Sequence, residues 1–356
     1  MVKKDRHCDT RFQELHVLLA GCGSIGKRHA RILKELGVGR LTVCDPVPAQ
    51  IEALMLQTPS VEACASFQLG LDAKPDAVFI LTPPKQHVPM AVDAVRAGCH
   101  VFVEKPVSDS LDGVEPLAEL VRRSASKVMI GLCFRYHRGL RKAKALIESG
   151  TIGRLISIRA LMGEHLPQVR PDFQSLFSAQ YSGAFDLMHD LDLAIWFANQ
   201  RVEAVQALYG TCSDIGISAP DLVEILIGFE DRCTASVHLD FFQRPRRRQI
   251  ELIGSDGTII VEFARWDQYT LSTYRPDRND WESLSETVSR DDMFRDEDRA
   301  FLSATVGNGE IDCTIDEACK SLRVIAAAQG MNSLWKGRAN PPKVSEAARE
   351  REAAGV

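Results

Sequence analysis

The sequence of 356 residues lacks three features that mark specialised classes of protein. It has no run approaching the ~20 consecutive apolar residues that a membrane-spanning helix requires. Its first fourteen residues are polar and lack the apolar segment of a secretory signal. Acidic residues outnumber basic ones, 48 to 43, so the basic excess typical of nucleic-acid-binding proteins is missing. We therefore expect a cytoplasmic protein that binds neither membranes nor nucleic acids.

The ten cysteines form no C-x-x-C pair, which is the spacing of many zinc and redox sites. Several, such as Cys22 and Cys44, lie inside apolar runs. We expect them to be small buried thiols in a reducing compartment, and we predict no metal site. The remaining composition, 45% hydrophobic and 26% charged, is that of a globular chain, and its length suggests about two domains.

The chain changes character at about residue 131. Before it, short apolar runs rich in Val, Ile and Leu alternate with longer amphipathic segments such as 25–36 and 87–97. This alternation predicts a parallel sheet with helices on both faces. After it, β-like runs follow one another without helices between them, which favours an open, mainly antiparallel sheet. The apolar runs of the first part are 15–20, 41–44, 77–81, 100–103 and 127–130.

A glycine-rich segment lies between the first apolar run and the first predicted helix. In this context Gly21 permits a tight turn, Gly23 lets a pyrophosphate approach the backbone, and Gly26 allows close helix–strand packing. Ser24 and Ile25 begin the helix, whose unbonded N–H groups attract phosphate. The spacing predicts a dinucleotide site, with a glycine turn that binds nothing as the alternative.

Asp45 ends the second apolar run, 24 positions after Gly21. A carboxylate there can accept hydrogen bonds from both adenosine ribose hydroxyls and would repel a 2′-phosphate. We therefore predict NAD as the cofactor. NADP stays possible because Lys27, Arg28 and Arg40 lie nearby in the sequence.

These patterns together predict an α/β protein in which an N-terminal dinucleotide-binding domain of the Rossmann type precedes a C-terminal α+β domain. The expected limits are a polar N-terminal extension at 1–14, the Rossmann domain at 15–133, the second domain at 134–340 and a polar tail at 341–356.

Thr82 and Pro83 follow the apolar run 77–81, at the edge of the sheet where ligands bind. Proline stiffens this loop, so we place Thr82 and Pro83 in the cofactor site. His87 either contacts the cofactor or holds the loop from the first turn of the next helix.

Glu104-Lys105-Pro106 stands at the end of the run 100–103 and faces the same crevice. We place Glu104 and Lys105 beside the cofactor. The Lys105 ammonium can polarise the oxygen of an alcohol or carbonyl group. The alternative is an ordinary surface ion pair between the two side chains.

A predicted helix from about 184 to 198 carries Asp186 and His189. At about 100° per residue these two side chains lie some 60° apart on one face, so His189 can act as a general base oriented by a carboxylate. The alternative is a helix start decorated with acidic residues, with His189 exposed to solvent.

These four motifs, in this order, resemble the Gfo/Idh/MocA family of nicotinamide-dependent oxidoreductases. The resemblance is most specific at LTPPKQHVPMAVDAVRAGCHVFVEKPVS, residues 81–108, and continues at 131–160, 246–263 and 293–304. It implies that Lys105 and His189 are catalytic, that the peptide to Pro106 is cis, and that an open sheet forms the oligomer interface.

One departure bears on the substrate. Many polyol dehydrogenases of the family have Asp four residues before the histidine, where this chain has Phe185. Asp186 resembles instead a branch with D-L-x-H-E-[LI]-D, which often accompanies sugar-nucleotide pathways. We take Asp186 as a third catalytic residue on this basis.

The resemblance implies an NAD(P)-dependent oxidoreductase that oxidises a secondary alcohol, or reduces the ketone, of a sugar, sugar derivative or sugar nucleotide. A glycosidase using tightly bound NAD by transient oxidation, and an aldose–aldose oxidoreductase, are alternatives. A homodimer or homotetramer is expected. The expected substrate contacts are Arg135, Tyr136, Arg170 and Asp190. The arginines at 170, 244 and 246 either bind a carboxylate or phosphate or lie in solvated turns or oligomer contacts.

Overall fold

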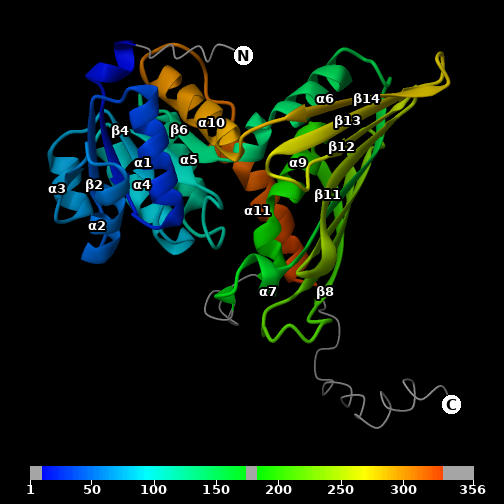
Figure 1. Cartoon of the computed structure of the whole chain (residues 1–356), viewed down its shortest axis with the longest axis horizontal. Coiled ribbons are helices and arrows are strands. Elements are labelled where there is room, and N and C mark those ends of the chain that lie inside the picture. The colour runs from blue at the N-terminus through cyan, green and yellow to red at the C-terminus, as the bar shows by residue number, and fades with distance from the viewer. Residues whose placement is uncertain (1–9, 174–182, 332–356) are drawn as a thin grey trace, which may run out of the picture.

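The computed structural model describes residues 10–173 and 183–331, which fold into two domains side by side (Figure 1). The N-terminal domain is built on a six-stranded parallel sheet of order β3-β2-β1-β4-β5-β6. Its strands are β1 (His16–Ala20), β2 (Arg40–Cys44), β3 (Glu62–Ala63), β4 (Ala77–Ile80), β5 (His100–Glu104) and β6 (Val128–Gly131). Apart from His16, His100 and Glu104 at strand ends, the central strands β1, β4 and β5 are apolar because helices cover both faces of the sheet.

The order of the strands reverses at β1, which pairs with β2 on one side and β4 on the other. In open parallel sheets such a point leaves a crevice at the carboxyl ends of the strands, where ligands bind. The helices that connect the strands are α1 (Ser24–Leu36), α2 (Pro48–Gln57), α3 (Phe67–Asp72), α4 (His87–Arg96) and α5 (Val114–Arg122).

The C-terminal domain is built on an eight-stranded sheet of order β14-β13-β12-β11-β7-β10-β9-β8. All neighbouring strands are antiparallel except β7 and β10. The strands are β7 (Leu155–His165), β8 (Val202–Gly210), β9 (Leu222–Phe229), β10 (Thr234–Asp240), β11 (Phe242–Gly254), β12 (Thr258–Glu262), β13 (Gln268–Arg275) and β14 (Asp280–Thr287). The predicted fold class is confirmed.

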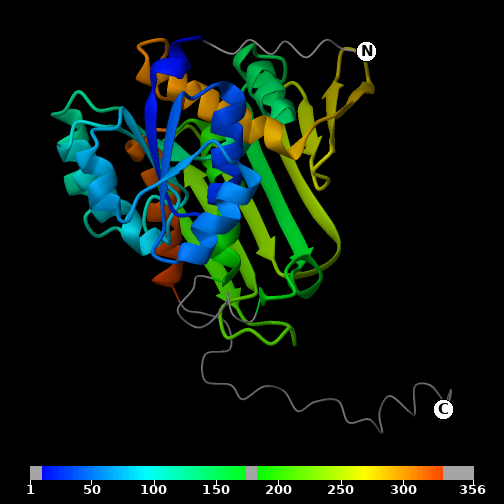
Figure 2. The same ribbon diagram turned by 60° about the vertical axis from the view of Figure 1, so that its left-hand side comes forward.

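Helices cover the face of this sheet that looks toward the N-terminal domain (Figures 1 and 2). They are α6 (Arg138–Glu148), α9 (His189–Ala198) and α11 (Ile315–Gln329). Alternate strand residues point to this face and are buried, as in β9, where Val223, Ile225 and Ile227 are almost fully buried. The site therefore lies between the helical face and the cofactor crevice.

Helix α10 (Arg290–Thr305) returns to the N-terminal domain, although the limits expected from the sequence place it in the second. It packs against α1, where the side chains of His29 and Asp298 pair at 2.8 Å with both fully buried. Phe301 packs edge-on against Phe79 of β4 at 5.3 Å. In this position α10 covers a part of the apolar face of the parallel sheet that α1 alone leaves uncovered.

The two ends of the chain are only partly described. A 3-10 helix at Thr10–Glu14 places Phe12 in the core, so the last part of the expected polar extension is folded. The tail expected at 341–356 lies outside the described residues.

Candidate active site between the two domains

The glycine-rich loop turns sharply between β1 and α1. Gly21 has φ of +99°, and a Cβ there would stand 2.5 Å from the Leu81 carbonyl oxygen. A Cβ at Gly26 would stand 1.9 Å from the Gly21 carbonyl oxygen, so only glycine lets the helix approach the strand. A Cβ at Gly23 would meet nothing within 4 Å. Gly23 thus faces open space before the first turn of α1, which no side chain caps.

Asp45 is held against this loop at the end of β2. Its carboxylate accepts hydrogen bonds from the N–H groups of Cys22 at 2.7 Å and Val47 at 2.8 Å. The negative charge is therefore fixed where an adenosine ribose would lie. The nearby cations are engaged with other side chains: Lys27 with Gln50, Arg28 with Asp291, and Arg40 with Glu62. This arrangement fits NAD and disfavours the extra phosphate of NADP.

His87 bridges two loops at the edge of the parallel sheet. One ring nitrogen lies 2.7 Å from the Thr82 carbonyl oxygen and the other 2.8 Å from that of Pro106. Burial lowers the pKa of His87, so the ring is neutral and donates to one carbonyl at a time. His87 therefore holds the loop that carries Thr82 and Pro83, and the Lys105–Pro106 peptide beside it is cis.

The structure brings the three proposed catalytic residues together. Lys105 follows β5 directly, and its ammonium donates to the carbonyl oxygen of Asp186 at 3.4 Å. His189 is the first residue of α9, and the charge of Lys105 acts on its ring. A cation and an imidazole thus face the crevice at the carboxyl ends of the parallel strands.

The helix expected at 184–198 is two elements. Residues Gly183–Leu187 form a 3-10 turn, and α9 begins only at His189. A 3-10 turn advances each residue by about 120°, so α-helical spacing does not relate Asp186 to His189. Within the described residues, Nδ1 of His189 is buried and has no hydrogen-bond partner, so the expected bond from Asp186 to this atom is not formed.

The surroundings of His189 favour its neutral form. Burial, and then the charges of Lys105 and Arg248, hold the pKa of His189 well below its usual range. The ring of Phe134 lies 4.9 Å from the imidazole and packs against it. A neutral imidazole at pH 7 can accept the proton of a hydroxyl group.

Two buried ion pairs fix the helix that carries His189. The guanidinium of Arg248 binds both carboxylate oxygens of Asp190, at 2.7 and 3.0 Å. Arg135 binds both oxygens of Asp192, at 2.7 and 2.9 Å. Bidentate pairs of this kind set orientation as well as distance. Arg135 and Asp190 were expected to contact substrate, but their charged groups are committed to these pairs, and we assign them to holding α9.

The other two expected substrate contacts have no bond to Lys105 or His189 among the described residues, although Tyr136 lines the cavity beside Trp266. Tyr136 is 3% exposed, and burial raises the pKa of its phenol. Its hydroxyl group has no partner in the part of the chain that the structure describes. Arg170 follows the short helix α7 (Leu166–Val169) and is exposed. The described interactions give it no bond to Lys105 or His189.

A set of buried acids behind Lys105 was not foreseen. Glu297 on α10 is fully buried, and burial followed by the charges of Glu104 and Asp298 raises its pKa well above the usual range. Burial also raises the pKa of Glu104, despite the neighbouring charges of Lys105 and His29. The segment RDEDRAF reads as a solvent-facing helix because its acids outnumber its apolar residues. Only the packing of α10 on α1 shows which acids are inside.

The described residues contain no group of three or more His, Cys, Asp or Glu side chains arranged to hold a metal ion. None of the helices they form is long and apolar enough to cross a membrane.

A dinucleotide-binding α/β domain, joined to a sheet domain that presents a neutral histidine beside a lysine, defines a nicotinamide-dependent oxidoreductase. Residues 15–132 match the model of the oxidoreductase family with an NAD-binding Rossmann fold, and residues 140–260 match the GFO/IDH/MocA C-terminal domain. The chain belongs to the Gfo/Idh/MocA family, and its N-terminal domain binds NAD.

Known relatives are distant in sequence and similar in fold. The chain is 24% identical to the uncharacterised oxidoreductase YrbE of Bacillus subtilis, over 87% of this chain and 92% of that protein. It is 27% identical to the myo-inositol dehydrogenase Hyg17 of Streptomyces leeuwenhoekii, over 63% of this chain and 66% of the relative. The crystal structure of myo-inositol 2-dehydrogenase from Lactobacillus plantarum matches with a TM-score of 0.74 at 23% identity, covering 88% and 96% of the two chains.

Proposed function

We propose that this protein uses NAD to oxidise a secondary alcohol of a sugar or sugar derivative, or to reduce the corresponding ketone. The observation that carries the proposal is that the Lys105 ammonium acts on a half-buried His189, whose pKa is lowered, at the edge of the nucleotide-binding domain. The names of relatives support the substrate class: they include inositol 2-dehydrogenases and a UDP-N-acetylglucosamine 3-dehydrogenase.

The residues divide the work between proton transfer and charge stabilisation. His189 accepts the hydroxyl proton at Nε2, because burial keeps the ring unprotonated. The Lys105 ammonium stabilises the negative charge that develops on the substrate oxygen, and it is fixed in place before the reaction begins. Bound NAD supplies the hydride acceptor. The Asp190–Arg248 and Asp192–Arg135 pairs hold α9 so that His189 keeps its position.

The first experiment is to denature the purified protein and identify any nucleotide that it releases by mass spectrometry. A protein that arrives empty and reduces added NAD with a sugar or cyclitol supports the proposal. Stoichiometric NAD that does not exchange would favour a closed redox cycle, as in NAD-dependent glycosidases or aldose–aldose oxidoreductases. Recovered NADP would contradict the role given to Asp45.

We further propose a homodimer or homotetramer in a reducing cytoplasm. The sheet face opposite the helices exposes Leu208 at 54% and Leu226 at 59%, which supports association there. All nine cysteines of the described part are free thiols, which supports a reducing compartment. Light scattering that gives a monomer mass would contradict the oligomer.

A further inference from the structure

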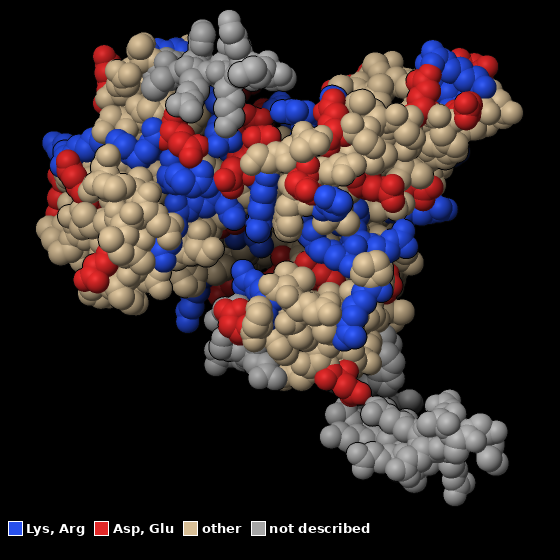
Figure 3. Space-filling view, viewed as in Figure 1, with Lys and Arg blue, Asp and Glu red and all other residues tan. Residues whose placement is uncertain are grey.

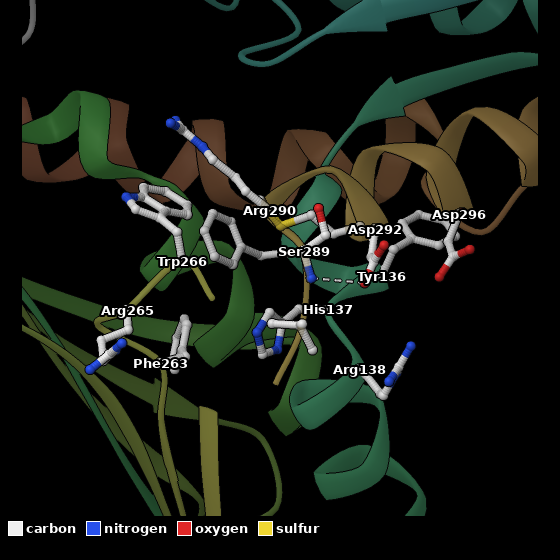
Figure 4. A pocket seen from close by; sticks show the side chains of 13 residues that line it. Tyr136, His137, Arg138, Phe263, Arg265, Trp266, Ser289, Arg290, Asp292 and Asp296 are labelled. Atoms are coloured by element: carbon white, nitrogen blue, oxygen red, sulfur yellow. Dashed lines mark hydrogen bonds between the residues drawn. The ribbon is translucent and has the colours of Figure 1, made fainter. Parts of the chain in front are cut away.

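A tryptophan between β12 and β13 is flanked by two arginines in the cleft. The Cζ atom of Arg290 lies 4.1 Å from the centroid of the Trp266 ring, and that of Arg246 lies 4.6 Å from it. Figure 4 shows Arg290 reaching over the indole at one side of a cavity, with Asp292 and Asp296 at the other. Cation–π contacts of this kind hold guanidinium groups in a fixed orientation.

The positive charge at this tryptophan is only partly neutralised. Arg246 donates to Glu164 at 2.9 Å and to the Ala264 carbonyl oxygen, which leaves donors on its second terminal nitrogen. Arg290 is exposed, and among the described residues its guanidinium has neither an ion-pair nor a hydrogen-bond partner. Burial and neighbouring arginines lower the pKa values of both groups, as expected where like charges crowd together.

The acids nearest to Arg290 in the sequence are bound elsewhere. Asp291 pairs with Arg28 and Arg31. Asp292 accepts from the Ser289 N–H at 2.9 Å and closes the capping box of α10. Basic side chains accordingly gather where the two domains meet (Figure 3). Arg246 is therefore paired with Glu164, whereas the Arg290 guanidinium, in a cavity that Asp292 and Asp296 also line, has no ion-pair partner among the described residues.

This basic patch is close to the proposed catalytic centre. The Phe134 ring lies 4.9 Å from that of His189 and 6.2 Å from that of Trp266. Arg248, which holds α9, lies over the same phenylalanine at 3.7 Å. Phe134 therefore links the proposed base and the indole through direct ring contacts.

We propose that the substrate carries an oxyanion, a carboxylate or a phosphate, and that Arg290 and Arg246 bind it beside Trp266 while its hydroxyl group lies at His189. The inference rests on the proposed function and narrows its substrate to anionic sugars. A guanidinium presents two parallel N–H donors that match the oxygens of either group.

The test compares three probes on the NAD-saturated protein: glucose, glucuronate and glucose 6-phosphate. Binding is measured by calorimetry and hydride transfer by NADH absorbance. We expect at least one anionic sugar to bind about tenfold or more tightly than glucose, and Arg290→Gln to remove that preference. Arg290→Lys keeps the charge but loses the paired donors, so it should retain part of it. Preference for glucuronate or for glucose 6-phosphate identifies the oxyanion.

Arg265→Gln is the matched control, because Arg265 is adjacent to Trp266 but pairs with Asp267 at 2.9 Å in solvent. It should leave the preference intact. Equal binding of all three sugars, no binding of either anionic sugar, or an unchanged preference in Arg290→Gln overturns the inference. So does a loss of NAD affinity in that variant without a change in sugar preference. Arg290-dependent binding without hydride transfer would refute the proposed function alone, and oxidation of glucose with no preference would refute this inference alone.

Discussion

The two sides of the cleft are built by different means. The cofactor side consists of main-chain turns within the first 90 residues, where the loop at 21–26 and the loop held by His87 meet. The catalytic side depends on charges from distant segments, such as Arg135 with Asp192 and Arg248 with Asp190. The first is sensitive to added atoms near the backbone, and the second to the loss of one partner of a buried charge. Substitutions on the two sides should therefore fail in different ways.

The largest effect is expected at Lys105. Lys105→Met should lower kcat by about 10²–10³-fold because a fixed charge at the developing alkoxide is lost. The dissociation constant of NAD, measured by fluorescence titration, should change little. Equal turnover in variant and wild type would show that the cation does not act in the reaction.

The buried pairs separate stability from catalysis. Asp190→Leu leaves the Arg248 charge buried and unpaired and should reduce the free energy of unfolding by about 3–5 kcal/mol in urea titrations. Adding Arg248→Met should restore most of that stability, while kcat stays low because α9 has lost its orientation.

The control for the Asp190–Arg248 pair is another bidentate Arg–Asp ion pair that is exposed to solvent. Arg275 binds Asp277 through two hydrogen bonds in solvent, so Asp277→Leu should cost less than about 1 kcal/mol. A comparable loss at both sites would mean that burial is not what matters.

A substitution at Gly23 should weaken cofactor binding without loss of stability, the reverse of what is expected at Asp190. A Cβ at this position meets nothing in the protein, so Gly23→Ala should keep the melting temperature of the cofactor-free chain. The methyl group occupies the space proposed for the pyrophosphate, so NAD should bind about tenfold or more weakly. Gly26→Ala is the contrasting variant, because its Cβ would clash with Gly21 and lower stability directly.

Glu297 should make the free energy of unfolding depend on pH. Its pKa is raised in the folded chain, so the folded state binds more protons than the unfolded state above about pH 4.5 and loses stability as pH rises. Glu297→Gln removes this dependence. The variant should gain stability relative to wild type between pH 5 and 8, by at most about 1.4 kcal/mol per unit. Parallel stability curves would contradict a neutral Glu297.

The smallest expected effect concerns the pH dependence of kcat, which should stay flat where a free histidine would titrate. Because the pKa of His189 is held well below 6.5, protonation of this base should not reduce kcat for alcohol oxidation between pH 8 and 6.5. A fall in kcat centred near pH 6.5 would contradict this and would show that the His189 imidazole titrates as it does in water.

The spacing of residues in the sequence predicts the residues of the cofactor side well. It predicts the ion pairs of the catalytic side poorly. The Gly21–Gly26 spacing can be interpreted from the sequence alone. The backbone atoms that exclude a side chain at Gly21 and Gly26 lie within a few residues or on the adjacent strand. The pairing of Asp190 with Arg248 depends on a contact between α9 and β11, 58 positions apart in the sequence. No periodicity distinguishes such an acid from one that faces solvent.

In the second domain, too, the sequence predicts which helices and strands form but not where they pack. The apolar alternation of its strands predicts the sheet, and the amphipathic segment at 293–306 predicts a helix. That α10 lies on α1 follows from His29, Phe79 and Phe301 meeting across the domains. The break between Leu187 and His189 was missed because a 3-10 turn and the first turn of an α-helix have similar sequences.

The return of α10 to the first domain has a mechanical consequence. Within the described residues the chain passes between the domains at 132–137, at 288–289 and again at 306–314. Three separate tethers restrict relative movement far more than one linker does, so the domains can tilt only slightly around the line of the crossings. A protease that cuts any one crossing would leave the two domains connected through the other two, with the two fragments held together by noncovalent packing such as that of α10 on α1.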